Sequence, residues 1–411
     1  MATRTTTKND AMFERALQLV PGGAYGHAAM TPPGLPRFFA TGKGALITDV
    51  DGNEYIDFMC GYGPNLLGMR HERVEEAAAT QRSLGDCFSG PTPQWIDLAE
   101  ALVERINHAD WAMFNKNGTD ATTLCMTVSR NNTGKRKILV ARDAYHGAAP
   151  WCTPSMGGVL PEDRAHLVYY RYNDLDSINE VLTGIEGDVS GIIVSPFKHD
   201  AFVDQELPTQ EFASGVREIC DRLDAHLIID EVRGGFRTCR GGSWEHLGVD
   251  ADLSAWGKAL GNGYAISAVV GTEATREGAT TVYTTGSFWY AGVAMAAANE
   301  TLRVADEIDL PGILGTSGSR FRNGLDDLAA TYGFSLRQTG PVSMPMIIFD
   351  DDDDLGKGTF FSENAADQGV YWHPYHNMFL SAAHTADVID EALGRLERSF
   401  DALRTHVGDN G

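Results

Sequence analysis

Long apolar runs and paired cysteines are both missing from this chain of 411 residues. No apolar run approaches the roughly 20 residues that a helix needs to span a bilayer. The N-terminal sequence MATRTTTKND lacks the apolar core of a signal peptide, so we expect a cytoplasmic location. The six cysteines are scattered without a CxxC pair, which favours reduced thiols over a disulfide framework or a metal site such as zinc.

Positive charge is scarce as well. The chain has 33 Lys and Arg against 56 Asp and Glu, which gives a formal net charge of −23. This balance argues against a nucleic-acid partner and against binding to an anionic membrane surface. It does not exclude an acidic substrate, because one local basic group can reverse the field of the whole molecule.

Three common motifs are absent. There is no GxxxxGK[ST], which argues against a P-loop nucleotide site, and no GxSxG, which argues against a hydrolase with a nucleophile elbow. Gly61-Tyr62-Gly63 is not followed by the third glycine of a dinucleotide fingerprint.

Short β-rich runs alternate with helical patterns from about residue 95 to residue 300. Such alternation predicts an α/β fold with a mostly parallel sheet covered by helices. A chain of this length exceeds one small core, so we expect two domains. The predicted strands include Lys137–Ala141, His166–Tyr170, Gly191–Val194, Leu227–Asp230 and Ser267–Gly271, with a further strand at Ser343–Phe349.

The most informative stretch runs from Leu227 to Gly263. A predicted buried strand ends in Asp230, and Lys258 follows in a Gly-rich turn after a second apolar patch. This combination suits pyridoxal 5'-phosphate (PLP), because a lysine can hold the cofactor aldehyde as an imine. The aspartate can keep the pyridine nitrogen protonated, so that the ring accepts electrons from a substrate carbanion.

Three weaker patterns accompany this stretch. Gly118 and Thr119 open a helical pattern, whose free N–H groups suit a phosphate or are an ordinary helix cap. Tyr145 follows a predicted strand and either stacks on a flat ring or packs in the core. The turn Thr284–Tyr290 carries hydroxyls and aromatics, and is a second anion-binding turn or a loop over the core.

Together these stretches resemble the class III, fold type I enzymes that use PLP, most closely the glutamate-1-semialdehyde aminomutases and their aminotransferase relatives. The resemblance covers nearly the whole chain in the same order. The motifs that carry it are VPGG at 20–23, DVDGNEYIDF at 49–58, NGTDAT at 117–122, AYHG at 144–147, IIDEV at 228–232, WGKALGNG at 256–263 and FLSAAHT at 379–385.

The resemblance implies the fold. It implies a large PLP-binding domain at 61–299, with a mostly parallel sheet of the seven-stranded type. It also implies a smaller α+β domain built from both termini, residues 1–60 and 300–411.

The resemblance also implies roles for single residues. Lys258 resembles the imine lysine and Asp230 the partner of the pyridine nitrogen. Val232 resembles the residue on the ring face opposite Tyr145, and Gly118 and Thr119 resemble phosphate ligands. Ser287 falls where the family has a threonine that reaches the phosphate of the neighbouring subunit, which implies a homodimer with shared active sites.

Departures from the family concern the substrate. Residues 24–29 contain no arginine, whereas the aminomutases carry one there that pairs with a substrate carboxylate. His376 stands at the place of a family glutamate. We therefore expect the substrate site among His27, Tyr62, Lys198, Trp289 and His376, drawn from a wider group that adds Tyr25, Arg233 and Tyr290; for each of these, packing is the alternative.

The chemistry favours a ping-pong aminotransferase that moves an amino group from an amine or amino acid to a keto or aldehyde acceptor. The alternatives are an aminomutase or racemase, against which the missing arginine and glutamate count, and a PLP-binding protein without catalysis.

Overall fold

The computed structural model describes residues 4–410, which divide into two compact units. The first unit holds residues 4–71, 201–204 and 312–410, and the second holds residues 72–200 and 205–311. The first unit therefore includes both ends of the described chain. The predicted boundaries at residues 60 and 299 stay a prediction.

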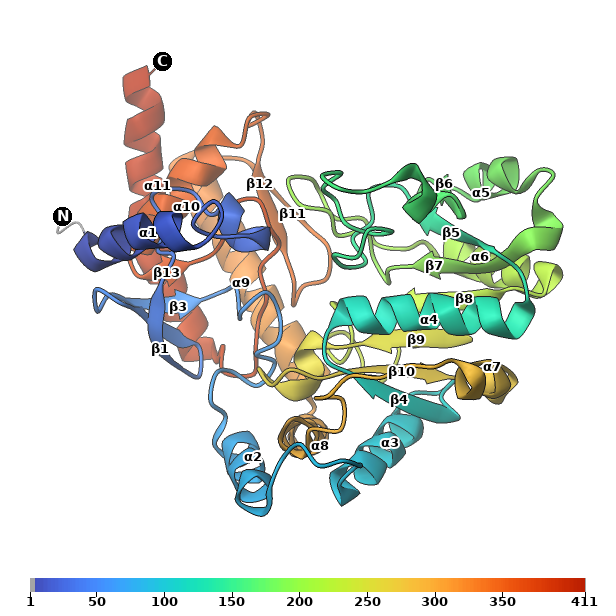
Figure 1. The fold of residues 1–411 in the computed structure, drawn as a ribbon. Helices are drawn as coiled ribbons and strands as arrows, with labels where there is room; N and C mark the ends of the chain where they lie inside the picture. Colours follow the sequence, from blue (N-terminus) through green and yellow to red (C-terminus); the bar gives the residue numbers. More distant parts are fainter. Residues whose placement is uncertain (1–3, 411) are drawn as a thin grey trace. The chain divides into compact units, whose positions relative to one another are not determined.

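The second unit is organised around a seven-stranded sheet with the order β4-β10-β9-β8-β7-β5-β6 (Figure 1). Its neighbours are parallel from β9 to β6, whereas β10 is antiparallel to both β4 and β9. This confirms the mostly parallel sheet. The strands are β4 (Trp111–Asn115), β5 (Lys137–Ala141), β6 (Leu167–Tyr170), β7 (Val189–Val194), β8 (His226–Asp230), β9 (Leu253–Trp256) and β10 (Ser267–Gly271).

Helices cover both faces of this sheet. In β8, Leu227 and Ile229 belong to the core cluster that contains α6, whereas Ile228 belongs to the cluster that contains α4. Successive side chains of a strand point to opposite faces, so a continuous apolar run marks a strand buried on both sides. The helices are α2 (Glu72–Leu84), α3 (Pro93–Arg105), α4 (Gly118–Thr133), α5 (Leu175–Leu182), α6 (Gln210–Leu223), α7 (Arg276–Thr281) and α8 (Gly292–Glu307).

The first unit contains a four-stranded sheet with the order β1-β2-β3-β13. Its last strand, β13 (Val370–Tyr371), pairs in parallel with β3 (Glu54–Asp57), which joins the C-terminal segment to the N-terminal hairpin. The other elements of this unit are α1 (Thr7–Leu19), β1 (Phe39–Lys43), β2 (Leu46–Asp49), α9 (Leu310–Tyr332, which begins in the second unit), β11 (Leu336–Thr339), β12 (Met346–Phe349), α10 (Gly356–Asp367) and α11 (Ala386–Asn410).

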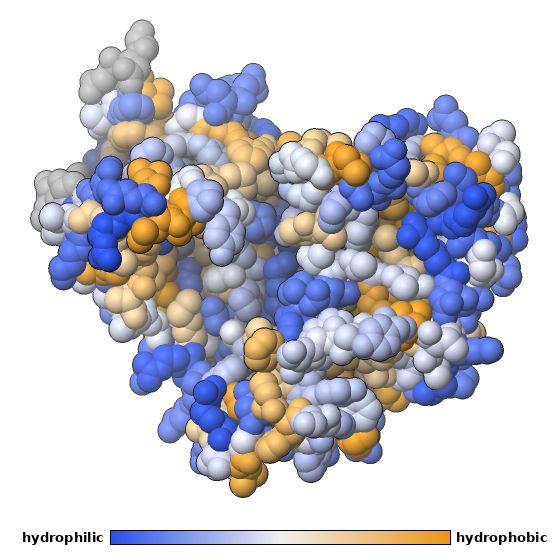
Figure 2. Space-filling model, viewed as in Figure 1, coloured by the Kyte–Doolittle hydropathy of each residue, from blue (hydrophilic) through white to orange (hydrophobic). Residues whose placement is uncertain are grey.

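Within residues 4–410, no helix combines the length and the apolar character that crossing a bilayer requires. On the face shown in Figure 2, hydrophobic residues occur in small groups among hydrophilic ones. Small exposed apolar groups of this kind are normal for a folded protein surface.

Candidate active site

The polar residues predicted for the cofactor lie at one edge of the sheet in the second unit. Asp230 is the last residue of β8. Lys258 follows β9 after a single intervening residue, Gly257, and Tyr145 lies a few residues after β5. Since these strands are parallel, their carboxyl ends meet at the same edge. Strand β4 runs in the same direction as β9, because both are antiparallel to β10, so the start of α4 is at this edge too.

Asp230 is held by two hydrogen bonds. Its Oδ2 is 2.7 Å from Nδ1 of His146, and its Oδ1 accepts the amide of Val232 at 3.1 Å. Asp230 is 4% exposed and His146 is 2% exposed. The carboxylate is therefore fixed in orientation, as a group must be if it is to keep a ring nitrogen protonated.

Lys258 begins the short 3-10 helix η5 (Lys258–Gly261) and has a φ of 41°, in the left-handed region. Side chains with a Cβ rarely adopt this region, so the surrounding packing must hold the backbone there. Burial and, to a smaller extent, the charges of Arg233 and Arg237 together lower the pKa of Lys258 to about 7, against the opposing effect of Asp230. An amine with this pKa is substantially neutral at neutral pH and can accept a proton.

The start of α4 is organised by a capping box. The side chain of Asn117 accepts the amide of Asp120 at 3.1 Å, and the Asp120 carboxylate accepts the amide of Asn117 at 3.2 Å. Among the residues that the structure describes, none accepts a hydrogen bond from the amides of Gly118 and Thr119. Two N–H groups at the positive end of a helix are thus available to an anion.

Gly118 is required by the close approach of Val232. A Cβ at position 118 would lie 2.6 Å from Cγ1 of Val232, and one at Gly257 would lie 3.4 Å from the same atom. The Val232 side chain is thereby placed between the helix start and the lysine turn. The hydroxyl of Thr119 is held by the loop after β5, because its Oγ1 accepts a hydrogen bond from the amide of Ala148 at 3.1 Å.

Tyr145 and the remaining predicted residues of the second unit differ in how far they are exposed to solvent. Tyr145 is half-buried, and burial raises the pKa of its phenol. Ser287 is exposed in the turn between α7 and α8, and Trp289 in the same turn is half-buried. Lys198 lies after β7 and its Nζ is 3.4 Å from Oδ2 of Asp200.

Three of the predicted substrate residues form a ring cluster in the first unit. The His27 ring stacks on Tyr62 with centroids 5.1 Å apart. His376 meets both edge-on, with centroids 5.4 Å from His27 and 5.2 Å from Tyr62. We call these three residues the ring triangle. Tyr25, from the wider group, is 80% exposed.

His146 and Arg233 are the groups near Asp230 that the sequence patterns did not assign a cofactor role. The signal for His146 was present, since it directly follows Tyr145 at the end of a strand. Arg233 is 6% exposed, and its Nη1 donates to the carbonyl of His199 at 3.3 Å. Glu231, next to Asp230, points elsewhere and accepts both the amide and the hydroxyl of Ser243, at 2.6 and 2.5 Å.

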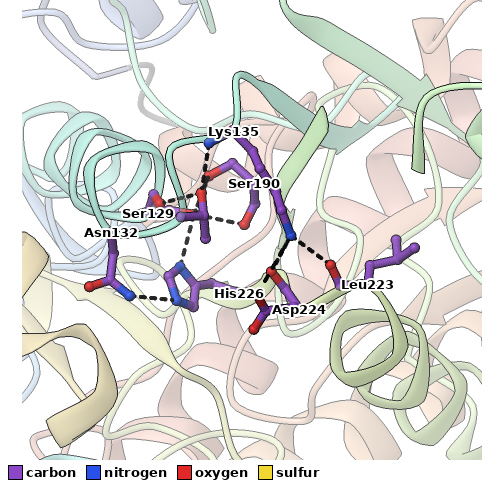
Figure 3. Close-up of polar contacts among 8 residues, drawn as sticks. Ser129, Asn132, Lys135, Ser190, Leu223, Asp224 and His226 are labelled. Atoms are coloured by element: carbon purple, nitrogen blue, oxygen red, sulfur yellow. Dashed lines mark hydrogen bonds and ion pairs between the residues drawn. The ribbon is translucent and has the colours of Figure 1, made fainter. Parts of the chain in front are cut away.

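A second polar cluster lies at the opposite end of β8 (Figure 3). Nδ1 of His226 is 3.1 Å from Oγ of Ser129, and Nδ2 of Asn132 is 3.3 Å from Nε2 of the same histidine. Ser129 is fully buried, and its Oγ lies 2.8 Å from the Ser190 hydroxyl. A serine beside a histidine has the composition of a nucleophile pair, but this one is closed to solvent at the edge of the sheet away from Asp230. It serves the packing of α4 on the sheet.

The sequence matches the class-III aminotransferase family over residues 29–400. The chain belongs to the class-III aminotransferase family. Its relatives include the aminopentol aminotransferase of Sphingopyxis macrogoltabida, which is 47% identical over 97% of this chain and 94% of its own length. The glutamate-1-semialdehyde 2,1-aminomutase of Methanothermobacter thermautotrophicus is 31% identical, over 97% of this chain and 100% of its own length.

The fold of this aminotransferase is similar to that of a solved structure. The FumI protein of Sphingopyxis sp. MTA144, in its PLP internal aldimine form, superposes with a TM-score of 0.95 at 47% identity. The match covers 96% of each chain. The fold type I architecture expected from the sequence is therefore confirmed.

The geometry of this aminotransferase fits a PLP molecule. The two amides at the start of α4 and the missing Cβ of Gly118 make a cradle for a phosphate. Asp230 is buried and fixed by His146, which suits a protonated ring nitrogen. Lys258 supplies an amine of lowered pKa at the same edge of the sheet.

Proposed function

We propose that this enzyme moves the amino group of a polyhydroxylated amine to a carbonyl acceptor, with PLP held by Gly118, Thr119, Tyr145, Asp230, Val232 and Lys258. The observation that carries the proposal is the meeting of Lys258, Asp230 and the α4 start at one edge of the sheet. The 47% identity to an aminopentol aminotransferase supports a donor that carries several hydroxyls. When bound, the cofactor supplies an electron-accepting ring for the carbon that loses a proton.

The residues of the chain divide the work of the reaction. Nζ of Lys258 would hold the cofactor aldehyde between turnovers. Once the substrate amine has taken its place, the same nitrogen, whose pKa is lowered to about 7, would accept the proton that leaves the carbon bearing the substrate nitrogen. Asp230 would face the ring nitrogen, and His146 maintains the direction of that carboxylate. The α4 amides and the Thr119 hydroxyl would hold the phosphate, which keeps the reacting atoms within reach of Lys258.

We place the recognition of the amine's hydroxyl-bearing chain on Lys198 and Trp289, which belong to the same unit as Lys258. An ammonium group and an indole N–H both donate hydrogen bonds, which the oxygen of a hydroxyl accepts. We further propose that the enzyme is a homodimer in which Ser287 completes the phosphate site of a second copy. The exposure of Ser287 in a turn supports this arrangement. The free cysteines among the described residues agree with a reducing cytoplasmic location.

The test is a half-reaction followed by absorbance. The PLP-loaded protein is mixed with single amines, including amino polyols and alanine, without an acceptor. A productive donor abolishes the absorbance of the lysine-bound cofactor, and a keto acid restores it. Lys258→Ala, which keeps the phosphate and ring contacts, is expected to bind PLP but to show no such cycle. A cycle in Lys258→Ala, or borohydride trapping of the cofactor on another lysine, would contradict the assignment.

Isotope tracing separates transamination from the aminomutase alternative. An aminotransferase releases a free carbonyl product and transfers labelled nitrogen to a different carbon skeleton. If the label returns to the same skeleton without a free carbonyl product, the aminomutase alternative replaces the proposal.

A further inference from the structure

Hydrogen bonds join the first turns of α4 to the loop that follows β5. Thr122 is completely buried, and its hydroxyl lies 2.8 Å from the carbonyl of His146. Two carbonyls of its own helix, those of Gly118 and Thr119, are further away at 3.1 and 3.2 Å. The amide of Ala148 donates to Oγ1 of Thr119 at 3.1 Å. The shortest contact of the Thr122 hydroxyl is therefore with the loop and not with its own helix.

Gly147 lies between these two contacts and packs directly on α4. Its φ is 129°, which side chains rarely adopt, and a Cβ there would lie 2.4 Å from Oγ1 of Thr119. Further along the loop, Nε1 of Trp151 donates to Oγ1 of Thr123 at 2.9 Å. Residues 146–151 thus contact α4 at successive points and cannot shift along the helix without breaking them. We call this set of contacts the α4–loop contact.

Each side of the α4–loop contact carries one end of the proposed cofactor site. The helix side presents the amides of Gly118 and Thr119 to a phosphate. The loop side carries His146, whose Nδ1 is 2.7 Å from Oδ2 of Asp230, the proposed partner of the ring nitrogen. Because the carbonyl of His146 accepts the Thr122 hydroxyl, a displacement of the helix start reaches the imidazole and then the carboxylate.

The hydroxyl of Thr119 adds a second connection. Its oxygen accepts the Ala148 amide, and among residues 4–410 none accepts its proton. A phosphate oxygen accepts hydrogen bonds, so it takes this proton. A hydroxyl that donates to an anion is polarised and becomes a better acceptor, which strengthens its bond with the loop. Binding of an anion at α4 and the observed position of the loop therefore favour each other.

We propose that Thr122 is a positioning residue that couples the phosphate end of the cofactor site to the ring end. Each end then binds its part of the cofactor more tightly when the other end is occupied. The inference rests on the placement of PLP given under the proposed function, and it concerns binding and not turnover. It follows that the protein prefers the intact phosphorylated cofactor by more than the contacts of the phosphate alone.

The experiment divides the cofactor into two parts. The cofactor-free protein is titrated with pyridoxal, which has the ring and the aldehyde but no phosphate, with and without saturating inorganic phosphate at constant ionic strength. Quenching of the protein fluorescence gives the Kd for pyridoxal. In wild type we expect phosphate to lower this Kd about 5-fold, which corresponds to one neutral hydrogen bond.

Variants of α4 assign the coupling to Thr122. Thr122→Val removes the hydroxyl, and we expect the effect of phosphate on the Kd for pyridoxal to fall below about 2-fold. The pH titration of the absorbance of bound PLP should also shift, because His146 then holds Asp230 less firmly. Thr122→Ser keeps the hydroxyl and should restore both readouts. Thr127→Val is the matched control, because this exposed hydroxyl bonds only within α4, to the carbonyl of Thr123 at 2.8 Å.

The outcomes separate this inference from the proposed function. If phosphate leaves the Kd for pyridoxal unchanged in wild type, or raises it, the coupling is overturned. An equal effect of phosphate in wild type and Thr122→Val overturns the role of Thr122, as does a loss that Thr122→Ser does not restore. Should Thr122→Val not fold, Trp151→Phe removes another bond of the α4–loop contact, and an unchanged effect of phosphate in that variant overturns the inference. If wild type binds PLP but cycles with no amine, only the proposed function fails.

Discussion

Nδ1 of His146 and Oδ2 of Asp230 lie 2.7 Å apart, and both side chains are almost completely buried. The His146 ring also stacks on Trp151, with centroids 6.2 Å apart and planes inclined by 16°. The imidazole is held from two directions and in turn holds the carboxylate. We therefore regard His146 as a positioning residue that acts on the cofactor through Asp230.

Replacing His146 tests this relationship. His146→Phe retains a ring against Trp151 but removes the hydrogen bond to Asp230. We expect PLP affinity to fall by about 1–2 kcal/mol, the value of one buried hydrogen bond to a charged group. Fluorescence titration of the cofactor-free protein measures the affinity, and the pH titration of the cofactor absorbance is expected to shift. Asp230→Asn serves as the reference for a larger loss. Unchanged affinity and an unchanged titration would assign His146 to packing alone.

Lys258→Met is expected to stabilise the cofactor-free protein at neutral pH. The folded-state pKa of Lys258, about 7, is below the unfolded value near 10.4, so the unfolded chain binds more protons between these values. The penalty is full below pH 7 and vanishes above about pH 10.4. At pH 7 the variant should therefore gain on the order of 3–4 kcal/mol in its free energy of unfolding, and the gain should shrink by pH 10.

Urea denaturation of the cofactor-free proteins at both pH values measures this difference. Lys43→Met, at an exposed lysine, is the control and should show little change. A gain in Lys258→Met that does not depend on pH would mean that it comes from packing instead of from the buried amine.

Gly118→Ala is expected to disturb the cofactor site through Val232. The added Cβ would lie 2.6 Å from Cγ1 of Val232, closer than carbon atoms pack, so one of the two elements must move. Overpacking of this kind costs about 1–3 kcal/mol, and we expect much of it to appear as weaker PLP binding. Gly90→Ala is the matched control, because a Cβ there meets nothing within 4 Å. If both variants bind PLP like wild type, the close approach at Gly118 has no functional role.

The buried His108 should make the stability of the second unit depend on pH. Its Nε2 is 2.8 Å from Oγ of Ser254, and burial lowers its pKa to about 4, with Asp252 and Asp110 opposing. The unfolded histidine, with a pKa near 6.5, binds a proton first as the pH falls, so stability is lost below about pH 6.5. Between pH 7.5 and pH 5, this residue should remove about 2 kcal/mol. Urea denaturation of wild type and His108→Asn at the two pH values isolates this contribution, because only wild type should lose it at pH 5. If the midpoints of both proteins fall by the same amount between pH 7.5 and pH 5, His108 is not the cause.

The sequence predicted best those features that local pattern determines. Lys137–Ala141 and Ser267–Gly271 are strands with the predicted bounds, because a β-rich apolar run bounded by polar residues leaves little choice. The helical pattern that opens at Gly118 was predicted, and α4 begins there behind a capping box that Asn117 and Asp120 close within a few residues. The end of β8 at Asp230 likewise followed from the chain alone.

Errors arose where tertiary contacts decide. The predicted strand Ser343–Phe349 begins only at Met346, since the preceding residues form a turn in which the amide of Met344 donates to the carbonyl of Pro341. The acidic run Asp350–Asp354 has the composition of a solvated loop, but Asp352 is 6% exposed. It accepts the amides of Lys357 and Gly358, both at 2.8 Å, at the start of α10. The pairing of His146 with Asp230 joins segments that no local pattern connects.

The ring triangle has a consequence for substitutions in the first unit. His27, Tyr62 and His376 come from three separate segments, and each ring meets the other two. The cost of replacing one ring therefore depends on which of the others remain, and the three substitutions should not add. The three segments are thus tied together by one shared contact, so a triple variant must be measured itself and its stability does not follow from the three single variants.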